Sequence, residues 1–329
     1  MSKQINLIYG AVRLGFSDSG LLNPEDATDE NYKLIFELLK KHGVNHLDTG
    51  RLHGNAEERL GLLTADTDYG FSIDTKWVGG FFDPTSITKE RIIADAKDSL
   101  SKLGVKKIHT FYLHSPFRNA EIEDTLVGVN EAYKMGIFKH FGLSNFSPAQ
   151  VQQVYDVCKA NRLVLPTVYE GLYNPVNRKT EEELLPLLRK LGIRFNAYGV
   201  LAAGFLTKTR EHVVNHEGRF SKDQFRGIYA KMYNNSPFLD AHDEWGRIAN
   251  EEGVTRLELT YRWMSYHSSL RAELGDGILL GGRLGQLEET FHAIAQGALS
   301  EEAVEKIQKL WVKLEPHVNY IDNLGAMMQ

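Results

Sequence analysis

The sequence predicts a single-domain (β/α)₈ barrel, or TIM barrel, that takes in residues 1–329. Short apolar, β-rich segments alternate along the chain with amphipathic helical segments, and eight such units fit its length. The competing fold is a doubly wound sheet, which normally carries a G-x-G-x-x-G turn after its first strand. Here the first β-segment is followed by GAVRLG, which lacks that spacing and therefore favours the barrel.

Eight segments have the short, apolar character of buried parallel strands. They are 5–10, 44–49, 71–77, 108–114, 139–144, 163–170, 193–199 and 277–282. Helices are expected over 28–43, 88–104, 147–162 and 180–192. Glycines at the ends of three of them are stop signals, and Ser147-Pro148 is a start signal. The segment 205–254 is too long for an ordinary connection and predicts a long loop on the catalytic face.

The composition is that of a globular protein, with 42% hydrophobic and 25% charged residues. A net charge of −5 without a long basic block argues against nucleic acid or an anionic membrane as the main partner. Neither a signal-peptide core nor an apolar run of about 18 residues is present, so we expect a cytoplasmic protein. We expect it to be a monomer or a homodimer. The lone Cys158 excludes an internal disulfide and is expected to pack in the core.

Polar residues stand at the carboxyl ends of the expected strands, where barrel enzymes place their active sites. They are Asp48, Lys76, His114, Ser144, Asn145, Glu170 and Tyr198. Because buried Asp, Lys and His are costly unless they pair, this set favours a site for proton transfer. The alternative is a stabilising Asp48–Lys76 ion pair beside a core histidine. We expect no metal, because H-E-x-x-H and cysteine-ligand patterns are absent, and a G-x-S-x-G nucleophile elbow is absent as well.

At these motifs the chain resembles the aldo-keto reductase superfamily, with the aflatoxin-aldehyde and succinic-semialdehyde reductases as the most similar branch. The resemblance covers nearly the whole chain and is carried by HLDTGRLHGNAEERLG, IDTKW, FYLHSP, GLSNFS, LPTVYEGLYNP, LLPLLRKLGIRFNAYGVLAAGFLT and GDGILLGG. It implies a (β/α)₈ barrel that binds NADP(H) without a Rossmann fold and transfers hydride to aldehydes and ketones.

The resemblance also implies a catalytic tetrad of Asp, Tyr, Lys and His. Asp48, Lys76 and His114 match three members, but His53 stands where the tyrosine belongs. An unperturbed imidazole has a pKa of about 6.5, and a nearby Lys76 would lower it and keep the ring neutral. Three interpretations stay open: a working substitute for the phenol; a base for oxidation or for a lyase- or isomerase-type reaction; or a catalytically impaired homologue with a cofactor-binding or regulatory role.

The cofactor contacts that the resemblance implies are Ser144, Asn145, Glu170, Tyr198, Leu201, Ala202, Gly204, Arg219, Arg283, Gln286, Glu289 and Thr290. Glu170 replaces a glutamine that contacts the nicotinamide carboxamide. A carboxylate there cannot donate a hydrogen bond, so we expect it to favour NADP⁺ over NADPH. The 2′-phosphate loop is shortened, with Arg283 in place of a small hydroxyl residue and Thr290 in place of an asparagine.

The substrate side is expected to be aromatic. The candidate contacts are Trp77, Phe117 and Tyr233, with Phe81, Phe82, Phe225 and Tyr229 as further wall residues. The semialdehyde branch binds its substrate carboxylate through an Arg three residues after the tyrosine, but here Ser236 follows Tyr233 at that spacing. We therefore expect a bulky, non-acidic aldehyde or ketone, such as a secondary metabolite. Alternatively, these aromatics only pack the loops.

Overall fold

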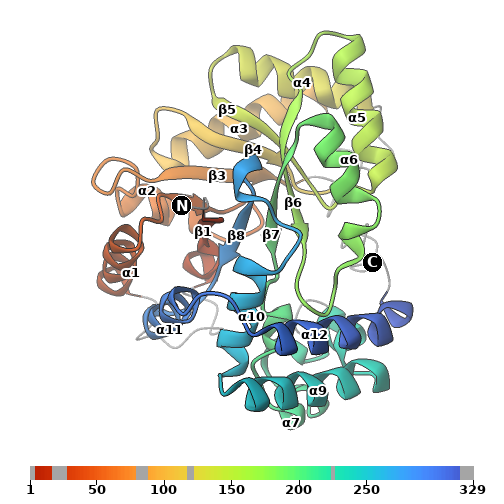
Figure 1. The fold of residues 1–329 in the computed structure, drawn as a ribbon. Coiled ribbons are helices and arrows are strands. Elements are labelled where there is room, and N and C mark those ends of the chain that lie inside the picture. Colours follow the sequence, from red (N-terminus) through yellow and green to blue (C-terminus); the bar gives the residue numbers. More distant parts are fainter. Residues whose placement is uncertain (1–3, 17–27, 79–87, 117–121, 224–226, 319–329) are drawn as a thin grey trace.

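A computed structural model describes residues 4–16, 28–78, 88–116, 122–223 and 227–318. Eight parallel strands close into one barrel in the order β1 to β8 (Figure 1), which confirms the predicted (β/α)₈ fold. The strands are β1 Asn6–Gly10, β2 His46–Asp48, β3 Ser72–Trp77, β4 Ile108–Leu113, β5 Phe138–Ser144, β6 Pro166–Leu172, β7 Arg194–Tyr198 and β8 Gly277–Leu280.

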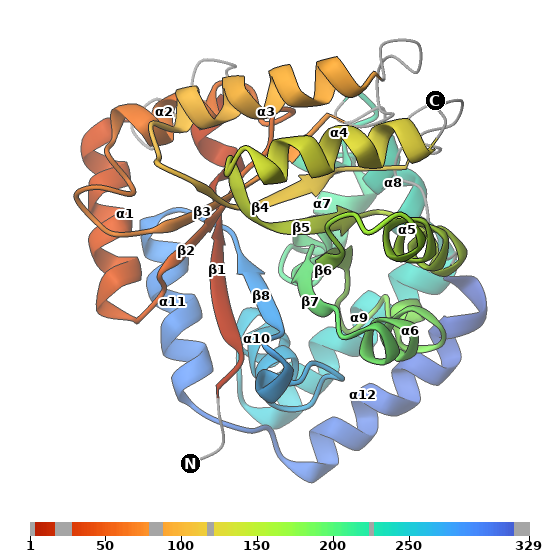
Figure 2. The same cartoon turned by 90° about the horizontal axis from the view of Figure 1, so that it is seen from above.

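Helices surround the barrel and cover its apolar outer surface (Figure 2). They are α1 Asp29–Lys41, α2 Ala56–Leu62, α3 Lys89–Leu103, α4 Ile122–Lys134, α5 Pro148–Ala160, α6 Leu184–Leu191, α7 Arg210–Val214, α8 Ile228–Tyr233, α9 Ser236–Glu252, α10 Arg256–Tyr266, α11 Leu284–Ala295 and α12 Glu301–Leu314. None of these described helices is long and apolar enough to cross a membrane.

The helix ends follow the signals in the sequence. Ser147 caps α5 by accepting from the Gln150 backbone at 3.3 Å, and the Gln150 side chain accepts from the Ser147 N–H at 2.8 Å. Gly104 and Gly192 end α3 and α6 in the left-handed conformation, with φ of 65° and 69°. α6 begins later than expected, which puts Pro186 in its first turn, where a missing N–H breaks no helical bond.

The segment 205–254 is largely helical rather than an extended loop. It contains α7, α8 and α9, and α9 packs against α12 and α10 (Figure 1). The Asn235 side chain caps α9 by accepting from the Phe238 N–H at 3.4 Å, and Gly253 ends that helix with φ of 74°. The segment therefore forms a helical layer after β7.

β6 runs from Pro166 to Leu172, which is two residues beyond the expected end at residue 170. The register with β5 shifts at its start, where Phe141 pairs with Pro166 and Gly142 pairs with Val168. Proline has no N–H to donate to the ladder, so it suits this irregular first position. Glu170 consequently lies inside β6, opposite Ser144.

Candidate active site

Asp48 and Lys76 meet in the interior of the barrel, at the end of β2 and near the end of β3. The Lys76 ammonium is 1% exposed; it donates to both oxygens of Asp48 and, at 2.9 Å, to the Thr49 carbonyl. Glu170 Oε1 lies 3.2 Å from the same nitrogen. Burial lowers the pKa of Lys76, but Asp48 and Glu170 outweigh it and raise that pKa. These four oxygen atoms, from three residues, occupy all three N–H donors of the ammonium group.

Glu170 stays protonated at pH values at which an ordinary glutamate is already ionised. Burial and then the Asp48 carboxyl raise the pKa of Glu170 well above its usual value, although Lys76 lowers it. Burial raises the pKa of Asp48 as well, and Lys76 lowers it. Asp48 is the group that keeps its charge because Lys76 donates directly to both of its oxygens. The expectation that Glu170 is a carboxylate favouring NADP⁺ stays a prediction, and the raised pKa of Glu170 argues against it. A protonated carboxyl group both donates and accepts, as glutamine does.

His53 lies in the loop between β2 and α2, and its ring faces that of His114, which directly follows β4. The ring centroids are 5.8 Å apart and the planes meet at 85°. Burial, and then the positive charge of Lys76, lower the pKa of His53 to about 3. Burial, Lys76 and His53 lower the pKa of His114 well below its usual value. Both residues are half-buried, and their lowered pKa values favour neutral rings at physiological pH.

Among the described residues, Lys76 makes no hydrogen bond to His53, which stands in the position of the family's tyrosine. His53 Nδ1 is buried without a hydrogen-bond partner in the part of the chain that the structure describes. The N–H groups of Lys76 are directed to Asp48, Thr49 and Glu170. Lys76 therefore acts on His53 through its charge alone. A neutral imidazole with a lowered pKa is a poor acid and a poor base, but its N–H still donates a hydrogen bond.

The predicted nicotinamide contacts converge beside this pair. Asn145 adopts a left-handed conformation with φ of 61°, and its Nδ2 donates to the His114 carbonyl at 2.9 Å and to Ser144 Oγ at 3.1 Å. The Tyr198 hydroxyl donates to Asn145 Oδ1 at 2.7 Å. Glu170 lies opposite Ser144 in the ladder, and its Oε2 is buried without a partner among the described residues. One buried oxygen is thus left for a further polar group.

The remaining predicted cofactor residues lie after β7 and β8. Leu201 precedes a tight 3-10 turn, Ala202–Gly204, in which Ala202 and Gly204 have φ of 51° and 101°. Arg219 is exposed in a second 3-10 turn, Gly218–Phe220. These positions suit a loop that wraps a ligand, and their contacts stay predictions.

The start of α11 carries the predicted 2′-phosphate residues. Arg283 is its exposed N-cap residue, and the Arg283 N–H donates to Gln286 Oε1 at 3.0 Å. Gln286 and Glu289 are exposed. Thr290 is buried, and its hydroxyl donates to the Gln286 carbonyl at 2.8 Å, so it is turned toward its own helix.

The predicted substrate residues divide into three groups. Trp77 is buried, and its indole donates to Asp95 of α3 at 2.9 Å, outside the barrel. Adjacent strand residues point to opposite faces, so the inward Lys76 turns Trp77 outward, and a substrate contact by Trp77 is not supported. Tyr233 is buried and stacks on Phe205 at a centroid distance of 5.0 Å. Phe81, Phe82, Phe117 and Phe225 lie outside the described residues.

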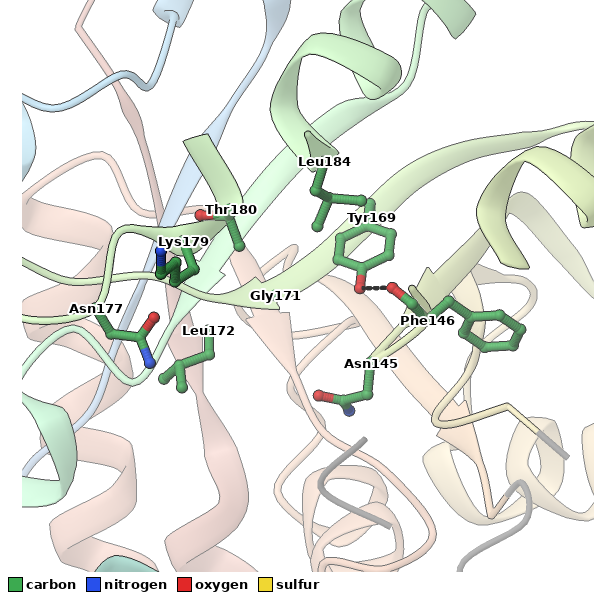
Figure 3. A pocket seen from close by; sticks show the side chains of 9 residues that line it. All are labelled: Asn145, Phe146, Tyr169, Gly171, Leu172, Asn177, Lys179, Thr180 and Leu184. Atoms are coloured by element: carbon green, nitrogen blue, oxygen red, sulfur yellow. Dashed lines mark hydrogen bonds between the residues drawn. The ribbon is translucent and has the colours of Figure 1, made fainter. Parts of the chain in front are cut away.

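A hollow flanks the site between the ends of β5 and β6 and the start of α6 (Figure 3). Asn145, Leu172, Lys179 and Leu184 line it together with Tyr169, whose hydroxyl donates to the Phe146 carbonyl at 2.7 Å. None of the predicted tetrad residues lines this hollow. It therefore borders Asn145 and not the two imidazoles.

Two contributors to the site were not predicted. The Thr49 carbonyl anchors Lys76, and the Tyr112 ring lies 5.4 Å from the Lys76 ammonium. Asn196 donates to the Tyr112 hydroxyl at 3.2 Å and fixes that ring. Tyr112 could have been identified from the alternation of side chains along the strands, because it is the partner of Lys76 in the β3–β4 register.

Comparison with known proteins agrees with this geometry. Residues 6–312 match the Aldo/keto reductase family. Oxidoreductase sirO of Leptosphaeria maculans is 34% identical over 317 residues, which cover 93% of each chain. Aflatoxin B1 aldehyde reductase member 4 of Homo sapiens is 30% identical over 331 residues, covering 94% of this chain and 96% of the relative. Aldo-keto reductase pigE of Monascus ruber is 30% identical over 327 residues, covering 94% of each. The predicted resemblance is confirmed, and the chain belongs to the aldo/keto reductase family.

Proposed function

We propose that this protein is an NADP(H)-dependent oxidoreductase that reduces a bulky, non-acidic aldehyde or ketone, with two neutral imidazoles in place of a phenolic acid. Its family and the oxidoreductase and aldehyde reductase names of its relatives support a carbonyl-reducing oxidoreductase. The observation that carries the mechanism is the facing pair His53 and His114 beside a lysine whose donors are all occupied.

The described residues fit a nicotinamide cofactor. Glu170 Oε2 is a buried polar atom without a partner, and the Ser144 hydroxyl lies on the neighbouring strand at the same level. These two groups and Asn145 would hold the carboxamide, and the exposed Arg283 at the start of α11 would bind a 2′-phosphate. When bound, the cofactor supplies a hydride to the carbonyl carbon.

The protein's own contribution is to stabilise the negative charge that develops on the carbonyl oxygen. A neutral imidazole retains one N–H, and His53 and His114 can each direct that donor to an oxygen between them. Lys76 adds a positive field and transfers no proton, because Asp48, Thr49 and Glu170 occupy its donors. Water beside the half-buried His53 supplies the proton that completes the alcohol and is left as hydroxide, which bulk solvent neutralises.

The substrate class follows from what surrounds the mouth. Ser236 stands where an acid-binding arginine would stand, and it begins α9. Tyr233, Phe205 and Phe238 form a buried aromatic cluster on the helices after β7. Both features support an apolar substrate. The cytoplasmic location and the monomeric or homodimeric state stay predictions.

The proposal is tested with His53→Phe, which removes the donor and keeps a ring, and His53→Tyr, which supplies a phenol. NADPH binding is measured by fluorescence, and NADPH consumption is followed with 4-nitrobenzaldehyde and with succinic semialdehyde. We expect the wild type to prefer 4-nitrobenzaldehyde. H53F should lower kcat about 10- to 100-fold, because a lost donor to a developing oxyanion typically costs that much or more. H53Y should raise kcat.

The matched control is His317→Phe, which changes an exposed histidine outside the site and should leave kcat unchanged. A wild-type rate in H53F would contradict the role of His53 as a donor. NADPH binding without turnover in wild type and H53Y would instead favour a non-redox enzyme or a cofactor-binding regulatory homologue.

A further inference from the structure

A second polar centre lies in the same strands, on the amino-terminal side of Asp48 and Lys76. His46 is the first residue of β2, Asp74 lies in β3 and His109 lies in β4. Their ligand atoms all lie within 4.8 Å of one another. No part of the proposed reaction uses these three residues.

Asp74 joins the two histidines. Its Oδ2 lies 2.9 Å from His46 Nε2, and its Oδ1 lies 2.9 Å from His109 Nδ1. The two imidazole rings meet edge to face, at 86° with centroids 4.4 Å apart. Two ring nitrogens therefore approach one carboxylate from different directions, as ligands of a single ion do.

The contact between His46 Nε2 and Asp74 Oδ2, at 2.9 Å, is an ion pair. His46 Nε2 and Asp74 Oδ2 are both buried, and neither has a partner in hydrogen-bond geometry among the described residues. Two such facing atoms at 2.9 Å in a buried site need either a proton or a metal cation between them. A cation between them would satisfy both. Asp74 itself is only 1% exposed.

Imidazole and carboxylate together select the class of ion. This ligand set suits first-row divalent metals such as Zn²⁺, whose bonds to His and Asp are about 2.0–2.2 Å. Ligands of a tetrahedral ion with these bond lengths lie about 3.3–3.5 Å apart, so the observed 2.9 Å separations would open by about half an ångström when the ion binds. The His46 and His109 side chains are each 20% exposed, which lets an ion enter and water complete its coordination.

We propose that His46, Asp74 and His109 bind one divalent transition-metal ion that ties β2, β3 and β4 together. This site revises the expectation of no metal, which rested on contiguous motifs, whereas these ligands come from three separate strands. His140 on β5 lies next to it, with its ring 5.0 Å from that of His109. The site is separate from the proposed reductase chemistry and stands without it.

The test is equilibrium metal binding by the full chain after treatment with a chelator. Zn²⁺ is titrated by calorimetry, and Co²⁺ is titrated by visible absorption, which reports its coordination directly. We expect one Zn²⁺ per chain in the wild type. His46→Gln, His109→Gln and Asp74→Asn should each raise Kd at least tenfold, because each removes one ligand.

Two controls separate this site from other histidines. His212→Gln breaks a histidine–carboxylate pair of the same 2.9 Å length in a less buried setting and should leave Kd unchanged. His53→Phe should also leave Kd unchanged, because it alters only the catalytic mouth. Circular dichroism checks the fold of each variant. X-ray absorption of the Zn²⁺-loaded wild type should show two imidazole ligands even if a variant fails to fold.

Two results would overturn the proposal. One is a wild type that binds neither Zn²⁺ nor Co²⁺, which would leave the cluster as a histidine–aspartate ion-pair network. The other is a Kd in folded H46Q and H109Q equal to that of the wild type.

Discussion

Glu170→Gln gives the sharpest test of the charge state inside the barrel. Glutamine keeps an acceptor for Lys76 and a donor for a neighbour, but it cannot ionise. The folded-state pKa of Glu170 is raised above its ordinary value of 4.5, by burial and then by Asp48. Above pH 4.5 the unfolded chain therefore releases this proton while the folded chain retains it. The wild type consequently loses stability as pH rises toward the folded-state pKa, and E170Q does not.

The size of this effect follows from linkage. Each pH unit over which only the folded state holds the proton costs about 1.4 kcal/mol. Between pH 5 and pH 7 the free energy of unfolding of E170Q should thus rise by up to about 2.7 kcal/mol relative to wild type. Urea unfolding at the two pH values measures it. Glu30→Gln, on an exposed residue in the first turn of α1, is the matched control.

The same variant tests the cofactor preference. If Glu170 is protonated, E170Q should keep the ratio of NADP⁺ to NADPH affinity within about threefold at neutral pH, less than 0.7 kcal/mol. A parallel pH dependence in E170Q and wild type, or a tenfold change in that ratio, would refute the reasoning and show that Glu170 is ionised.

Two further changes probe the barrel interior. Lys76→Met leaves Asp48 buried without its cation and should lower the free energy of unfolding by about 3–5 kcal/mol at neutral pH, as read from urea melts; a loss under 1 kcal/mol would contradict the pairing. Gly142→Ala would place a Cβ 2.3 Å from the buried Tyr112 ring and should cost at least about 1–3 kcal/mol. Gly281→Ala meets nothing within 4 Å and is its control. Equal stability losses in these two alanine variants would refute the close approach at Gly142.

Strand positions could be predicted because each buried strand is a short apolar segment bounded by turn or cap residues. A strand boundary differs from the predicted one where a proline and an irregular pairing set the register. Pro166 and the irregular pairing with β5 moved β6 forward by two residues at its end. Gly104 and Gly192 fixed the ends of their helices because both adopt positive φ there.

The polar strand ends could also be predicted, but their partners could not. Asp48 and Lys76 were recognisable by position, whereas Glu170 became a partner of Lys76 only through closure of the barrel. Strand alternation alone indicates that Trp77 points outward, opposite to Lys76, as its bond to Asp95 shows. His46, Asp74 and His109 lie far apart in sequence, and only the β2–β3–β4 arrangement brings them together.

The central claim is that His53 is neutral where the family places an ionisable phenol. It is tested most directly by nitrogen-15 NMR of histidine-labelled protein, with the His53 signals assigned by their loss in H53F. With its pKa lowered to about 3, His53 should remain neutral from pH 8 down to pH 5, where only about 1% would be protonated. A titration midpoint near 6.5 would contradict the account, because the ring would then be an ordinary acid at physiological pH.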